Sequence, residues 1–143
     1  IERFPINQKW NIKAEFKPFN KPKPITVPDV LNEGMRDTLY VMLEFSIEGK
    51  EYRLAPLNHP AKDDKFFIIF GDQTNGESTY GGGRYIYIPT PNEDNITYID
   101  FNKSYNPPCV FTEYATCPLP PAQNKLNIAI PAGEKMFKDE QTY

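Results

Sequence analysis

Apolar and polar residues alternate most regularly between Leu39 and Ile47. The apolar members of this segment fall at every second position: Leu39, Val41, Leu43, Phe45 and Ile47. A period of two predicts a β-strand with one face turned toward a core. Glu48-Gly49 follows, and Tyr52 and Leu54 then alternate with polar residues. Two alternating segments across a short, glycine-containing connection predict a β-hairpin.

Shorter segments with strand character occur along the rest of the chain, at residues 11–16, 25–27, 66–70, 85–88, 96–101 and 126–130. Turn signals such as Asn75-Gly76 separate them, and no segment has the 3.6-residue period of an amphipathic helix. We therefore predict an all-β fold of about seven or eight strands, either a single-domain antiparallel β-sandwich or a partly closed barrel.

Length and composition agree with this fold class. The chain has 143 residues, which fits a single β domain over residues 1–143. Its 15 prolines exclude long uninterrupted helices, and its 14% aromatic content favours strands. Because the chain begins with Ile1, we expect a trimmed product that lacks an amino-terminal segment of the full protein. Cytoplasmic and exported locations both stay open.

Charge and hydropathy limit the classes of partner that we expect for this chain. The net charge is −3 with interspersed signs and no basic face, so we expect no nucleic-acid partner. No apolar run approaches the roughly 20 residues that span a bilayer, so we expect no membrane span in this chain. No cofactor or metal site is expected. A small-molecule ligand remains as a partner, and the oligomeric state is not determined by these patterns.

The residues best suited to bind a ligand or take part in chemistry lie between Tyr80 and Pro121. The triple glycine 81–83 precedes Arg84. Glycines let the backbone approach a ligand closely, and a guanidinium next to them favours a carboxylate or phosphate. The spacing is neither a P-loop nor a dinucleotide fingerprint, and a bulge or bend in a strand is the structural alternative.

Asp100 and Asn102 stand at the end of a predicted strand, and Tyr105, Asn106 and Tyr114 follow them. One interpretation is an Asx turn. The functional interpretation is a polar wall across the sheet from the arginine, in which Asp100 orients the guanidinium for an anion. Antiparallel pairing of consecutive strands would bring the two side chains together.

Cys109 and Cys117 lie in a long, proline-rich connection over residues 102–123, which we expect to be ordered and packed. Four interpretations stay open for the two cysteines: buried free thiols, a disulfide, a metal site and a catalytic thiolate. A metal or a catalytic thiolate would need the single histidine, His59, whose simpler interpretation is a solvated loop residue.

Three motifs together resemble an uncharacterised bacterial and archaeal family, the domain-of-unknown-function family numbered 1684. They are residues 76–85 (GESTYGGGRY), 100–109 (DFNKSYNPPC) and 114–121 (YATCPLPP). The resemblance extends from Arg3 to Glu134. It implies no established activity, but it implies that the 80–121 stretch is the defining surface. The candidate site residues are Tyr80, Arg84, Asp100, Asn102, Tyr105, Asn106, Cys109, Tyr114 and Cys117.

Three functions fit these residues. The first is a small-molecule-binding β domain, in which an anionic ligand lies between the glycine-rich strand and the cysteine-containing loop. Arg84 would contact the anion, Asn102 and Asn106 would donate hydrogen bonds, and tyrosines would form the walls. The second is a hydrolase-like enzyme centred on Cys109 or Asp100. The third is a purely structural motif cluster that closes one end of a barrel.

Overall fold

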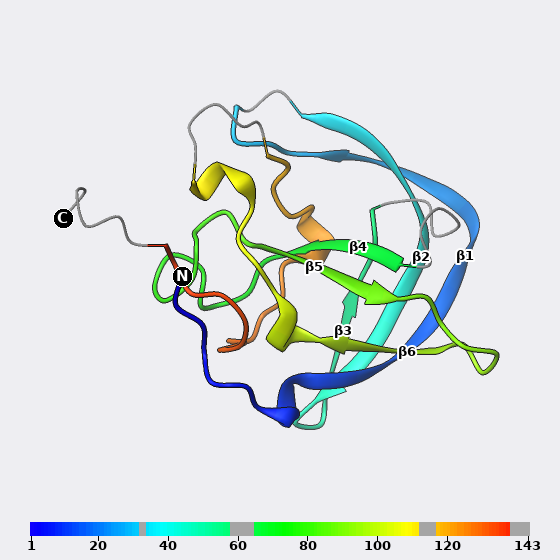
Figure 1. Cartoon of the computed structure of the whole chain (residues 1–143). Helices are drawn as coiled ribbons and strands as arrows, with labels where there is room; N and C mark the ends of the chain where they lie inside the picture. The colour runs from blue at the N-terminus through cyan, green and yellow to red at the C-terminus, as the bar shows by residue number, and fades with distance from the viewer. Residues whose placement is uncertain (32–33, 58–64, 112–116, 138–143) are drawn as a thin grey trace.

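The computed structural model describes residues 1–31, 34–57, 65–111 and 117–137 of the chain (Figure 1). Its described strands are β1 (Asn11–Val27), β2 (Met35–Ile47), β3 (Lys50–Leu54), β4 (Lys65–Phe70), β5 (Arg84–Pro89) and β6 (Ile96–Asp100). Four short 3-10 turns accompany them: η1 (Gln8–Trp10), η2 (Phe101–Lys103), η3 (Pro108–Val110) and η4 (Ala122–Asn124). The predicted all-β class is confirmed.

The strands form two antiparallel sheets. The larger sheet has the order β3-β2-β1-β6, and β4 pairs with β5 in the smaller one. In Figure 1, β1 and β2 run together as a curved pair along one side of the molecule, and β4 and β5 lie in the middle of the view. The larger sheet therefore forms a half-barrel. No helix among the described ranges has both the length and the apolar character needed to cross a membrane.

The predicted hairpin is present as β2 and β3, with Ile47 opposite Lys50. Its two connecting residues, Glu48 and Gly49, have φ values of 52° and 81°. Positive φ at both positions of a two-residue loop is typical of a type I′ turn, whose twist matches that of the flanking strands. The local sequence signal and the observed turn therefore agree.

β1 is much longer than the sequence pattern predicts, because it continues through a proline-rich segment. The pairing changes from Pro18 opposite Val41 to Lys23 opposite Leu39, which is five residues along β1 but only two along β2. This bulge bends the strand. Prolines are tolerated here because β6 pairs only with Asn11–Glu15 of β1 and the last donor toward that side is the N–H of Phe16, which bonds to the Asn95 carbonyl.

The predicted strand over residues 126–130 is absent. A single parallel bridge joins Gly71 to Lys125, just before this segment. The segment itself is held by separate backbone bonds, such as Leu126 N–H to the Gly71 carbonyl at 2.7 Å. The facing residues around Asp72 curl into a turn, so they do not offer a continuous ladder.

The core lies between the two sheets. Its main cluster holds side chains that are almost or completely buried, among them Trp10, Leu43, Phe45, Phe66, Phe70, Ile86, Phe101 and Ile130. A second cluster gathers Val27, Leu39, Ala55, Leu57, Ile69 and Tyr85; its members from β4 and β5 alternate with those of the main cluster and so lie on the opposite face of this pair of strands. The candidate site lies at the edge of the core, beside the end of β4 and the start of β5.

Candidate functional site

Arg84 opens β5, and its side chain is completely buried. Nη2 donates to Asp72 Oδ1 at 3.3 Å and to the Ile130 carbonyl at 3.0 Å, and Nη1 donates to the Ala132 carbonyl. The guanidinium carbon lies 5.2 Å from the centre of the Phe70 ring. The sequence interpretation paired Arg84 with Asp100; the structure pairs it with Asp72.

Burial lowers the pKa of the Arg84 guanidinium below its ordinary value, and the Asp72 carboxylate raises it in part. An arginine in this setting stays protonated. The positive charge is therefore compensated within the protein, and the side chain presents no surface to a ligand.

Asp72 is the acceptor of a buried network that sequence reasoning did not single out. Its carboxylate also accepts hydrogen bonds from Thr74 Oγ1 at 2.8 Å, Asn75 Nδ2 at 3.1 Å and the Ile130 N–H at 2.7 Å. One signal was available: an acidic residue two positions after the apolar run of β4 must find partners if the chain turns inward there.

Asp100 and Asn102 form a local cap. Asp100 Oδ1 accepts from the N–H of Asn102 at 3.1 Å and from its Nδ2 at 2.9 Å, which is the Asx-turn alternative. The Asn102 side chain also pairs with the backbone of Asn7, accepting from its N–H and donating to its carbonyl. These residues anchor the amino-terminal arm.

Asn106 and Tyr105 connect to other segments. The buried Asn106 donates its N–H to Glu134 Oε1 at 2.8 Å and its Nδ2 to the Lys135 carbonyl at 3.0 Å. Tyr105 forms an isolated antiparallel bridge with Tyr85 of β5. Neither residue lines the pocket that Gly81, Gly82 and Gly83 help to form. Tyr114 and His59 lie outside the described residues.

Cys109 and Cys117 are joined by a disulfide bond. Of the four interpretations that the sequence left open, the structure therefore takes the disulfide, and neither sulfur is available as a metal ligand or nucleophile. Within the described part of the chain, no group of three or more His, Cys, Asp or Glu side chains is arranged to hold a metal ion.

Replacing both cysteines with serine is expected to lower the free energy of unfolding by about 2–3 kcal/mol, because the bridge closes a loop of roughly nine residues in the unfolded chain. Urea unfolding of the oxidised protein, the reduced protein and the Cys109→Ser/Cys117→Ser variant measures this. The reduced protein should match the double variant. An unchanged unfolding midpoint in both would contradict the expected contribution.

A pocket of about 460 Å³ opens where the triple glycine meets the proline-rich segment. We call it the glycine–proline pocket. Its lining is Pro28, Gly71, Asp72, Gln73, Asn75, Gly81, Gly82, Gly83, Leu119, Pro120, Lys125 and Leu126. The Asp72 carboxylate is fully buried, so this residue lines the pocket with its backbone. Of the predicted site residues, Tyr80 and Arg84 flank the pocket in sequence, and Arg84 lies behind its wall.

The glycines bring the turn against the proline segment. Gly83 has a φ of 85°, and a Cβ atom there would lie 2.6 Å from both the Phe70 carbonyl oxygen and Pro120 Cγ. A Cβ on Gly82 would lie 2.5 Å from the Tyr80 ring. Side chains at these two positions would therefore push the walls of the pocket apart.

The proline wall is fixed from its other side. Leu119 N–H donates to the Pro28 carbonyl at 2.7 Å, and the Tyr85 hydroxyl donates to the Pro118 carbonyl at 3.0 Å. Burial raises the pKa of Tyr85 to about 12, so this phenol stays protonated and keeps donating at neutral pH. The pocket thus has walls held in place without a ligand.

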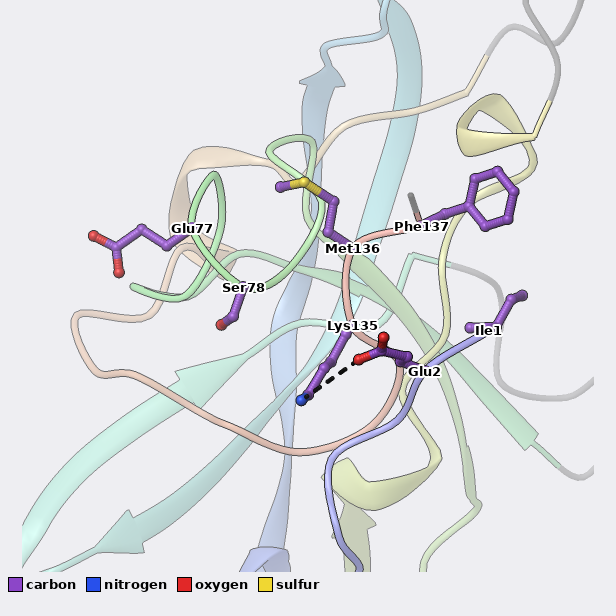
Figure 2. A pocket seen from close by; sticks show the side chains of 7 residues that line it. All are labelled: Ile1, Glu2, Glu77, Ser78, Lys135, Met136 and Phe137. Carbon is purple, nitrogen blue, oxygen red and sulfur yellow. Dashed lines mark ion pairs between the residues drawn. The ribbon is translucent and has the colours of Figure 1, made fainter. Parts of the chain in front are cut away.

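A second hollow of about 360 Å³ lies between the described ends of the chain (Figure 2). Ile1, Glu2, Glu77, Ser78, Lys135, Met136 and Phe137 line it. Lys135 Nζ lies 3.9 Å from Glu2, so the one lysine in this lining already faces a carboxylate. Because the triple glycine and Leu119-Pro120 line the glycine–proline pocket and not this groove, the glycine–proline pocket is the better candidate site.

Residues 1–135 match the family described as "Protein of unknown function (DUF1684)". Among solved structures, the chain is similar to an uncharacterized protein of Haloarcula marismortui determined by solution NMR, with 26% identity and a TM-score of 0.74. The match covers 94% of this chain and 75% of that one. No curated protein matches. Since the family match spans almost the whole chain, this protein belongs to the DUF1684 family.

Proposed function

We propose that this protein is a small-molecule-binding β domain and that an anionic ligand occupies the glycine–proline pocket. The observation that carries the proposal is the composition of the pocket: a backbone made accessible by three glycines faces a wall of prolines and leucine, with a single lysine at its rim. Pockets for small ligands combine such apolar walls with a few polar groups that fix orientation.

The balance of charge favours an anion. Asp72 and Arg84 neutralise each other beneath the pocket, and both side chains are fully buried. Lys125 lines the pocket, is exposed, and forms no ion pair with any residue that the structure describes. Its stem passes Gly71, where a Cβ atom would lie 3.5 Å from Lys125 Cγ. The lysine therefore contributes an uncompensated positive charge.

The glycine turn adds donors. Gly83 N–H donates to the Tyr80 carbonyl at 3.1 Å, which closes the turn. The N–H groups of Gly81 and Gly82 have no acceptor within the described ranges. Successive free N–H groups in a turn form a concavity that favours anions. Leu119, Pro120 and Leu126 would contact the apolar part of the ligand.

Lys125→Gln is expected to remove most of the stabilisation that a bound anion confers, because it deletes the charge and keeps much of the stem. Thermal unfolding of the wild type should be measured with acetate, succinate, hexanoate and inorganic phosphate, and any anion that raises the melting temperature is then tested on the variant.

Lys23→Gln serves as the control, since Lys23 is an exposed lysine of β1 that does not line the pocket. Gly81→Ala is the second test. A Cβ there meets nothing closer than Gly76 Cα at 4.0 Å, so the fold tolerates it, while the methyl group narrows the pocket. Equal stabilisation of the wild type, Lys125→Gln and Gly81→Ala would contradict the proposal.

A further inference from the structure

A further hollow of about 270 Å³ lies apart from the glycine–proline pocket. Lys65, Tyr87, Ile88, Pro89, Lys103 and Tyr105 line it, and we call it the tyrosine–lysine hollow. The two lysines come from the start of β4 and the end of η2, and Tyr87 comes from β5. The tyrosine–lysine hollow and the glycine–proline pocket share no lining residue.

Two tyrosine rings form one side of this hollow. The rings of Tyr87 and Tyr105 are nearly parallel, with an interplanar angle of 12° and centroids 6.3 Å apart. Tyr105 stands at 88° against Tyr85, and Tyr87 lies 5.0 Å from Phe67. Packing against these rings restricts both tyrosines, yet Tyr87 remains 50% exposed. A flat aromatic surface of defined orientation therefore faces outward.

The charge on this hollow is positive. Its lining contains two lysines and no acidic residue. In the part of the chain that the structure describes, neither Lys65 nor Lys103 forms an ion pair. Burial, above all, raises the pKa of Tyr105, so its phenol is neutral at physiological pH and does not repel an anion.

We propose that the tyrosine–lysine hollow binds a small anion with a single planar ring, such as an aromatic carboxylate. The ring would stack on Tyr87 and Tyr105, as bases stack on aromatic side chains. The carboxylate would contact Lys65 and Lys103 through charge-assisted hydrogen bonds. The hollow is smaller than the roughly 300–1,000 Å³ typical of pockets for drug-sized ligands, which favours one ring over a larger ligand.

The chain contains an internal comparison for this proposal. Tyr98 of β6 is also 50% exposed and lies opposite Lys13 of β1, but neither residue lines the hollow. An exposed tyrosine beside a lysine is therefore present twice. Only the site built from two parallel rings and two lysines is expected to bind.

Three ligands of similar size separate the contributions. The full chain is titrated with each ligand, and NMR of the tyrosine rings detects binding. The ligands are benzoate, cyclohexanecarboxylate, which has the charge without the flat ring, and benzamide, which has the ring without the charge. Benzoate should bind with a dissociation constant of about 10 mM or tighter, as for an efficient ligand of this size. The other two should bind at least about fivefold more weakly.

Variants then assign the site. Tyr87→Leu and Lys103→Gln should each weaken benzoate binding by about fivefold or more, whereas Tyr87→Phe, which keeps the ring, should retain it. Tyr98→Leu and Lys13→Gln should leave it unchanged. Equal affinity for benzoate and cyclohexanecarboxylate, an unaltered affinity in the first two variants, or no saturation at about five times the expected constant would overturn the proposal.

Discussion

Arg84→Met is expected to lower the free energy of unfolding by about 3–5 kcal/mol, because it leaves the Asp72 carboxylate buried without its cation. The Ala132 carbonyl would lose the guanidinium donor at the same time, and the Ile130 carbonyl would keep only the Ala132 N–H. Chemical denaturation of the wild type and the variant, followed by circular dichroism, measures the loss.

Arg3→Met provides the matched control. Arg3 also forms an ion pair, with Glu134 at 3.0 Å, but its side chain is 56% exposed, and such pairs contribute about 0–1 kcal/mol. Adding Asp72→Asn to Arg84→Met removes the remaining charge and should recover part of the stability. An Arg84→Met protein as stable as the wild type would show that the buried pair does not support the fold.

Asn124→Ala is the second substitution with a large expected effect, a loss of about 3–5 kcal/mol. The buried Asn124 side chain accepts from the N–H of Ala55 at 2.8 Å and donates to the carbonyls of Ala55 and Ile69 at 2.8 and 2.9 Å. Each buried backbone group left without a partner costs about 1–3 kcal/mol. This one amide joins the end of β3 to β4, so its removal weakens the seam between the sheets.

Asn127→Ala tests whether the position, and not the residue type, causes this effect. Asn127 is exposed and accepts one hydrogen bond, from Gln73 at 2.7 Å. Its replacement is expected to change the free energy of unfolding by less than about 0.5 kcal/mol, measured by the same denaturation. Similar losses in both variants would contradict the specific role of Asn124.

The sequence pattern predicted those strands in which apolar and polar residues alternate regularly. The apolar alternation of residues 39–47 lies within β2, and the Glu48-Gly49 turn leads into β3 as expected. β1 was harder, because prolines at 18, 22 and 24 interrupt its pattern. The structure accommodates them where β1 has a free edge, and a pattern of single residues does not reveal which edge is free.

For the motif residues too, some features were predictable from the sequence and others were not. Glycines at 82 and 83 are required by a close approach of the chain, in agreement with the glycine-rich signal. The partners of Arg84 and the pairing of the two cysteines were not predictable from their spacing. Asp72 lies twelve residues before Arg84, and Ile130 lies 46 residues after it, so only the folded chain brings them together.

By itself, the sequence determined the fold class, the main strands and the hairpin, because side-chain alternation and turn preference are properties of neighbouring residues. The tertiary structure alone decided that Arg84 turns inward to Asp72, that the proline segment packs on the glycine turn, and that two tyrosines and two lysines meet at a separate hollow. These arrangements depend on contacts between segments far apart in the chain, whose partners are selected by the packing of the whole core.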